Sequence, residues 1–364
     1  MRKQFVLLCI CILLLGLASG CVQKDPILIG FSSTLTGDKS EIGIALRDGL
    51  MLKVEEINAA GGINGRMVEV LIEDDQNDLA MVEAIDQGFV DKGVHAIFGH
   101  ELSSKASTII KATAGKETIV ISPTISTYDL SGSDDHFFRT ITSNYDQGKA
   151  IAGYASDIHR TLIVYDNVNK TFADGVIIGF TDNTSHPTDT LAIDGEIERE
   201  ASKMVDQLET ADYDSIIFVT NPHDTVFLNQ VLFKEKFDLQ RFSSNWGMAI
   251  NSLKEGGQAV EGLVFVSLLD QLETDSYKAF AAQFETRYKQ EPPFASIYSY
   301  ESALVLFAAL EKTETLTYDD IKESLLSLGE IEGLMGSFRL DQYGDVEREP
   351  FMTIVEKGEL RFIE

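Results

Sequence analysis

Short apolar runs and amphipathic stretches alternate along the chain, which predicts strands and helices in succession. Residues 27–31 form an apolar run of strand length, and residues 68–72 alternate between apolar and other side chains. Between them, apolar residues recur at three- and four-residue spacing, as on one face of a helix: Ile42, Leu46, Leu50, Val54 and Ile57. A strand, a helix and a second strand joined by short links predict a parallel sheet that helices cover.

The same order of elements continues through most of the chain. In the first half it predicts helices near 78–92 and 104–114 and strands near 94–99 and 118–122. A second set starts after Asp146, with strands near 161–165, 190–193 and 214–220 and helices up to Ile158 and from Phe172. Helical patterns follow at 276–289, 298–310 and 318–328. We therefore expect an α/β protein with two doubly wound, Rossmann-like lobes.

Length and charge narrow the possible partners. A chain of 364 residues exceeds the usual size of one compact core, which agrees with two lobes. It has 30 Lys and Arg residues against 58 Asp and Glu residues, a formal net charge of −28 at pH 7. A surface of this sign repels nucleic acid and anionic headgroups, so we expect no nucleic-acid partner.

The N-terminus has the pattern of an export signal. Arg2 and Lys3 precede an uncharged run of 14 residues, too short to span a bilayer and suited to the core of a signal peptide. The run closes with LASGC at Cys21, which resembles the lipobox of prokaryotic lipoproteins, whose cysteine is lipidated. We expect a signal peptide at 1–20, a tether at 21–26 and a protein held outside the cytoplasm by a lipid anchor on Cys21. A plain secretory signal is the alternative.

Two hydroxyl-rich stretches follow neighbouring predicted strands: IFGHELSSKAS at 97–107 and ISPTISTYDL at 121–130. Ligands bind open parallel sheets at the carboxyl ends of strands, where helix N-termini favour anions. Ser103 or Ser104 is expected to cap the next helix, which could be its whole role. Together, the two loops could receive one carboxylate.

An ordered set of motifs resembles a known family. The motifs are NAAGGINGR, EDDQND, FGHELSS, ISPTIST and FFRT followed by DQG, and they span 27 to about 180. In this order they resemble the solute-binding proteins of the leucine/isoleucine/valine-binding type, which serve ABC importers. The resemblance implies a type 1 periplasmic-binding fold, with lobes at 27–142 plus 270–337 and 143–269 plus 338–364. It also implies three hinge crossings, near Thr140–Asn144, Leu268–Leu272 and Gly336–Leu340.

The resemblance also implies the residues that contact the ligand. From the first lobe, Ser103, Thr124 and Ser126 match the positions that hold a carboxylate. From the second lobe, Phe172, Asn221 and Trp246 match positions over the ligand side chain, although Trp246 could also serve lobe packing.

Trp246 stands where the family has the acidic residue that neutralises the ligand ammonium. Glu101 or Glu301 could replace that residue, and Tyr298 is a further candidate near the cleft. The alternative is a ligand without an ammonium.

The sequence offers no constellation for catalysis. The six histidines are scattered without metal-ligand spacing, and no nucleotide loop or nucleophile motif is present. The acidic stretch at 73–78 could bind a hard cation, but a solvated loop is the favoured interpretation. We expect a monomeric binding lipoprotein without enzyme activity, cofactor or metal, which delivers an amino acid to an ABC permease. The alternatives are a regulator that presents its ligand to a membrane sensor, and import of another carboxylate, an amide or an aromatic acid.

Overall fold

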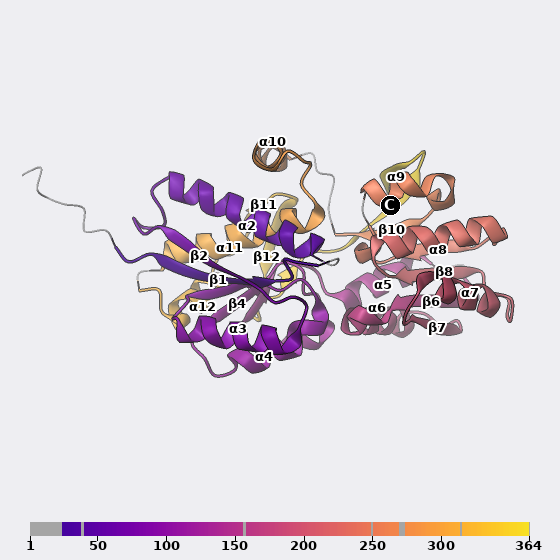
Figure 1. Ribbon diagram of the computed structural model, residues 1–364, viewed down its shortest axis with the longest axis horizontal. Helices are drawn as coiled ribbons and strands as arrows, with labels where there is room; N and C mark the ends of the chain where they lie inside the picture. The colour runs from indigo at the N-terminus through magenta and orange to yellow at the C-terminus, as the bar shows by residue number, and fades with distance from the viewer. Residues whose placement is uncertain are drawn as a thin grey trace, which may run out of the picture.

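Two α/β lobes lie side by side along the long axis of the molecule (Figure 1). The computed structural model describes residues 24–37, 40–155, 158–248, 250–268, 274–313 and 315–363. Each lobe has a sheet with parallel strands and covering helices, which confirms the predicted fold class. The predicted signal peptide and Cys21 lie outside the described residues. Within the described ranges, no helix combines the length and apolar character needed to cross a bilayer.

The sheet of the first lobe is parallel and has the order β2-β1-β3-β4-β5. β1 lies between β2 and β3, which places Phe31 beside both Ile72 and Phe98. The strands are β1 (Ile27–Ser33), β2 (Val68–Asp74), β3 (Ala96–Gly99), β4 (Ile119–Ser122) and β5 (Phe137–Arg139). The helices of this lobe are α2 (Glu41–Ala59), α3 (Leu79–Asp91), α4 (Ala106–Thr113), α11 (Phe294–Lys312) and α12 (Tyr318–Leu326).

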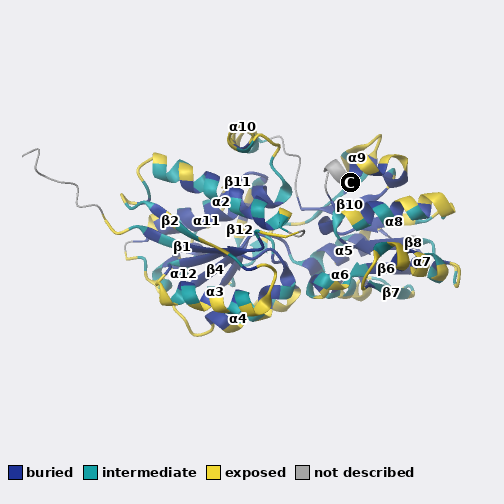
Figure 2. Cartoon of the chain, in the orientation of Figure 1, coloured by how far each residue is buried: buried dark blue, intermediate teal, exposed yellow. Residues whose placement is uncertain are grey.

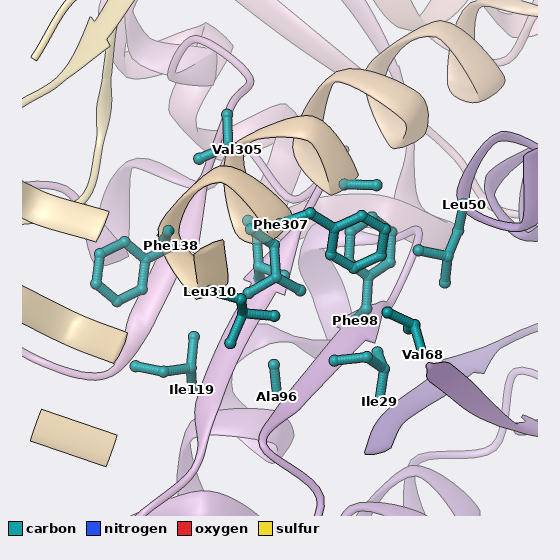
Figure 3. Close-up of a cluster of buried hydrophobic side chains, with 14 of the residues drawn as sticks. Ile29, Leu50, Val68, Ala96, Phe98, Ile119, Phe138, Val305, Phe307 and Leu310 are labelled. Carbon is teal, nitrogen blue, oxygen red and sulfur yellow. The ribbon is translucent and has the colours of Figure 1, made fainter. Parts of the chain in front are cut away.

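The core of this lobe forms between the sheet and helices α2 and α11. Side chains of β1, β3 and β4 meet Leu50 of α2 and Leu310 of α11 in one buried cluster (Figure 3). Gly49 allows α2 to approach α11 closely, because a Cβ there would lie 2.3 Å from the backbone oxygen of Ser296. The buried strands and the exposed outer faces of the helices are visible in Figure 2.

The sheet of the second lobe has the order β15-β14-β10-β9-β8-β6-β7, parallel except for β14 and β15. Its strands are β6 (Thr161–Asp166), β7 (Thr188–Ile193), β8 (Ser215–Val219), β9 (Gln240–Ser243), β10 (Val264–Ser267), β14 (Phe351–Glu356) and β15 (Glu359–Ile363). Its helices are α5 (Asn144–Tyr154), α6 (Lys170–Asp182), α7 (Ile197–Leu208), α8 (Pro222–Glu235) and α9 (Ile250–Gly256).

The structure describes the first predicted crossing and corrects the third, whereas most of the predicted second crossing, Leu268–Leu272, lies outside the described residues. The first crossing joins β5 to α5 through 140–143, and α10 (Asp275–Tyr288) is the next described helix after β10. The predicted third crossing at 336–340 is instead the strand β12 (Gly336–Leu340), which pairs with β11 (Ile331–Gly333) and β13 (Val346–Glu347). Phe338 packs in the core cluster of the first lobe, so the chain crosses to β14 only after Glu347.

Candidate functional site

A pocket lies where the two lobes face each other. The first lobe contributes residues that follow β3 and β4, and the second contributes residues that follow β6 and β9. The pocket has about 360 Å³ of empty space, part of it continuous with solvent. Its lining residues are Ile42, Glu101, Leu102, Thr124, Ser126, Ile141, Asn169, Phe172, Asn245, Trp246 and Phe294.

Hydrogen bonds hold together the two loops that form the first-lobe wall. The Ser126 amide donates to Ser103 Oγ at 3.2 Å, and Thr124 Oγ1 donates to the Glu101 carbonyl at 3.1 Å. These loops are neighbours because β3 and β4 pair in parallel. The hydroxyl of Ser126 is buried and has no hydrogen-bond partner among the described residues. It is therefore available to donate to an oxygen in the pocket.

Ser103 and Ser104 do not cap a helix, so that prediction is wrong. They belong to a 3₁₀ turn, η1 (Ser103–Lys105), which precedes α4, and neither turn nor helix begins with a side-chain cap bond. The serines therefore belong to this turn, and Lys105 rather than a serine stands directly before α4. Ser103 is buried and accepts the Ser126 amide, whereas the Ser104 amide donates across the cleft to Asn169 Oδ1 at 3.2 Å. The two lobes therefore touch at the edge of the pocket.

Aromatic side chains form part of the second-lobe wall. Phe172 on α6 meets Trp246 edge to face, with ring centroids 5.8 Å apart and an interplanar angle of 76°. Trp246 follows β9 in a short turn, η4 (Asn245–Gly247), and is 9% exposed. Such a pair gives a rigid apolar surface against which a ligand side chain can pack.

Asn245 adds a polar group to the same wall. Its amide donates to Gln147 Oε1 at 3.1 Å, whereas its side-chain Oδ1 is buried and accepts no hydrogen bond from a described residue. Neither Asn245 nor Asn169 was among the predicted site residues. Asn245 could have been predicted as a site residue because it is a polar residue directly before Trp246, which was predicted to lie at the site.

Four predicted site residues do not line the pocket: Ser103, Asn221, Tyr298 and Glu301. Asn221 caps α8, with its Oδ1 accepting the Asp224 amide at 3.0 Å. Tyr298 is buried in α11 and donates to the Leu268 carbonyl at 2.5 Å.

Glu301 is also committed to a structural contact. It is buried, pairs with Arg348 at 2.9 Å and accepts the Leu334 amide at 2.9 Å. It is therefore not free to neutralise a ligand ammonium.

Glu101 belongs to a buried charge cluster, which we define as Asp75, Glu101 and Lys105. Lys105 Nζ donates to Glu101 Oε1 at 2.6 Å and to Asp75 Oδ2 at 2.7 Å. Glu101 Oε2 also accepts the Ser33 hydroxyl at 2.6 Å, and Oε1 accepts that of Thr34 at 2.5 Å. Burial by itself would raise the pKa of Glu101, but the charge and hydrogen bond of Lys105, with the two hydroxyls, hold this pKa below its usual range. Glu101 is therefore ionised at neutral pH.

The charge cluster corrects one expectation from the sequence. The stretch 73–78 was expected to be a solvated acidic loop, but Asp75 is fully buried because Lys105 binds its carboxylate. Asp78 follows a more usual pattern, since its side chain caps α3. Within the described ranges, no group of three His, Cys, Asp or Glu residues is arranged to hold a metal ion.

Comparisons with known proteins agree with this geometry. The sequence pattern of the family described as periplasmic binding protein matches residues 26–359. The leucine-, isoleucine-, valine-, threonine- and alanine-binding protein of Pseudomonas aeruginosa is 22% identical over 350 residues, covering 94% of this chain and 92% of its own. These matches confirm the resemblance to leucine/isoleucine/valine-binding proteins.

Solved structures share the fold. One is the branched-chain amino acid transporter substrate-binding protein of Streptococcus pneumoniae in complex with isoleucine, with a TM-score of 0.81, 20% identity and coverage of 93% of this chain and 99% of that one. Another is an ABC transporter solute-binding protein of Rhodopseudomonas palustris in complex with 3,4-dihydroxybenzoic acid, with a TM-score of 0.79, 16% identity and coverage of 93% and 95%. Because the family pattern covers nearly all of the described residues, this chain belongs to the periplasmic binding protein family.

Proposed function

We propose that this chain is the extracytoplasmic substrate-binding component of an ABC importer and that it binds an amino acid between its lobes. The observation that carries the proposal is the pocket, to which one lobe contributes an unpartnered buried hydroxyl and the other an aromatic pair. The names of the Pseudomonas aeruginosa and Streptococcus pneumoniae relatives support the same ligand class.

In the proposed complex, the Ser126 hydroxyl donates a hydrogen bond to the ligand carboxylate, and Thr124, whose hydroxyl donates to the Glu101 carbonyl, lies beside it in the pocket wall. Ser103 supports Ser126 from behind, because its hydroxyl accepts the Ser126 amide. Phe172 and Trp246 contact the ligand side chain from the second lobe. A ligand that touches both lobes favours their closed arrangement by the difference between its affinities for the closed and open forms. The closed form is the one we expect a permease to recognise.

The proposal includes the anchor and the lobe boundaries. We propose that the signal peptide ends at Gly20 and that a lipidated Cys21 and the tether to residue 26 hold the protein at the membrane surface. The lobes are those expected from the sequence, except that residues 338–347 go with the first lobe, as the packing of Phe338 suggests. A monomer suffices for binding, since residues of one chain line the pocket.

The first test is a thermal-unfolding screen of the purified protein. The screen uses all proteinogenic amino acids, simple carboxylates and amides, and aromatic acids that include 3,4-dihydroxybenzoic acid. A ligand at about 100 times its Kd adds about 2.7 kcal/mol, which should raise the unfolding midpoint by about 4 °C in a chain of this length. A rise with one or more amino acids, much reduced in Ser126→Ala, supports the proposal. A rise only with ligands that lack an ammonium would contradict the amino-acid assignment.

A further inference from the structure

The buried charge cluster behind the first-lobe wall carries excess negative charge. Two carboxylates, those of Asp75 and Glu101, share the one ammonium of Lys105, which leaves a formal charge of −1. Asp75 and Lys105 are 0% exposed and Glu101 is 5% exposed, so water screens this charge poorly. Hydrogen bonds to Ser33 and Thr34 fix the carboxylates but add no positive charge.

The pocket has no balancing cation among its described lining residues, since Glu101 is the single ionisable side chain there. In the second-lobe wall, Asn245 is 7% exposed. Its buried Oδ1 accepts no hydrogen bond from the part of the chain that the structure describes. The excess charge and the unused acceptor both favour a ligand group that is cationic and donates hydrogen bonds.

We infer that the pocket selects a zwitterion, with the ligand ammonium held between the first-lobe charge cluster and Asn245 Oδ1. This inference rests on the proposed function, because it requires the ligand to occupy this pocket. The charge cluster then takes the place of the second-lobe acidic residue that Trp246 displaces. The same charge disfavours a ligand whose only charged group is a carboxylate, because like charges repel in a poorly hydrated site.

A purely structural charge cluster would make the same contacts but would not distinguish ligands by charge. It could hold the loops after β1, β2 and β3 together, since Thr34, Asp75 and Glu101 each follow one of these strands. The decisive measurement is therefore the ratio of two affinities rather than stability or a single Kd.

The test compares leucine with 4-methylpentanoate, which has the same side chain and carboxylate but no amino group. By calorimetry, the wild-type protein should bind leucine at least about tenfold more tightly than 4-methylpentanoate. Glu101→Gln should reduce this ratio by about tenfold, and Asp75→Asn, which removes the same charge behind the wall, should also reduce it. Asn245→Ala tests the ammonium contact from the second lobe. It should weaken leucine binding more than 4-methylpentanoate binding and so lower the same ratio.

Glu200→Gln is the matched control. Glu200 is a buried carboxylate on α7 that pairs with Lys203 at 2.8 Å and Arg199 at 2.9 Å, and it does not line the pocket. Its substitution should leave the ratio unchanged. Equal wild-type affinities for the two ligands, or a ratio that Glu101→Gln, Asp75→Asn and Asn245→Ala all preserve, would overturn the inference while leaving the proposed pocket intact. Binding of neither ligand would overturn the proposed function for branched-chain ligands and this inference with it.

Discussion

At the scale of single residues, the structure separates two serines that have equal weight in the sequence. Ser126 lines the pocket and its buried hydroxyl has no partner in the described chain, whereas the hydroxyl of Ser103 accepts the Ser126 amide. A hydrogen bond to a charged ligand group is worth roughly 1.5–3 kcal/mol and one between neutral groups about 0.5–1.5 kcal/mol. The two hydroxyls should therefore contribute unequally to binding.

We predict that Ser126→Ala weakens amino-acid binding by about 10- to 100-fold and Ser103→Ala by about two- to tenfold. The effect of Ser103→Ala is indirect, because the variant loses only the bond that positions Ser126. Calorimetric titration measures both, with Ser337→Ala on the exposed surface of β12 as a neutral control. A larger loss in Ser103→Ala than in Ser126→Ala would show that Ser103 itself contacts the ligand.

The hydroxyl residues Thr124 and Ser126 and the rings of Phe172 and Trp246 could be predicted because they match positions in the family that the sequence resembles, whereas the ring of Phe294 was not predicted. The charge cluster could not be predicted in full. Glu101 and Lys105 have a visible four-residue spacing, but Asp75 joins them only because β1 pairs with both β2 and β3. That pairing depends on sheet order, which a single sequence does not specify.

At the scale of elements, buried strands were the easiest to predict, since they are nearly continuous apolar runs such as that of β8. The sequence pattern led to no predicted helix at 222–235, the residues of α8. Asn221 was therefore assigned to the ligand site rather than to the start of that helix. The Asn-Pro pair at 221–222 is a helix-start signal, with Asn221 as the cap and Pro222 in the first turn. A polar residue after a strand can contact a ligand or cap the next helix. Here the proline that follows Asn221 indicates the cap.

Asn221→Ala should therefore affect stability and not binding. Loss of an N-cap side chain costs about 1 kcal/mol, which for a chain of this length lowers the unfolding midpoint by about 1–2 °C. Thermal unfolding without ligand and calorimetry with ligand measure the two effects separately. Asn221→Ser, which retains a capping oxygen, should recover most of the stability. A reduced affinity in Asn221→Ala at unchanged stability would place Asn221 at the ligand instead.

At the scale of the whole molecule, buried ion pairs connect the hinge to the first lobe. Arg139, at the end of β5, pairs with Asp345 at 2.7 Å, and Glu301 of α11 pairs with Arg348 at 2.9 Å. Arg348 follows β13 directly, on the segment that crosses to the second lobe. Polar and apolar residues alternate along β12, but a single sequence does not specify its pairing with β11 and β13. The third crossing was therefore expected at 336–340, the residues of β12, rather than after β13.

The charge of the whole chain has a consequence for its stability. With a formal net charge of −28 at pH 7, repulsion between carboxylates disfavours the compact state, and dissolved salt screens this repulsion. Surface ion pairs such as Lys170–Asp174 respond in the opposite direction, since salt weakens them, but each contributes only about 0–1 kcal/mol. Because acidic residues outnumber basic ones by 58 to 30, at least 28 carboxylates have no basic side chain of their own to pair with, and repulsion should dominate.

We therefore predict that raising NaCl from about 0.05 M to about 1 M, which shortens the screening length from more than about 10 Å to about 3 Å, raises the unfolding midpoint by at least about 2 °C. Scanning calorimetry at pH 7 measures this shift. KCl should have the same effect as NaCl, because screening depends on ionic strength and not on the identity of the cation. Near pH 4.5, where the formal charge approaches zero, the shift should shrink. A midpoint that falls with salt at pH 7 would mean that ion pairs outweigh the net charge.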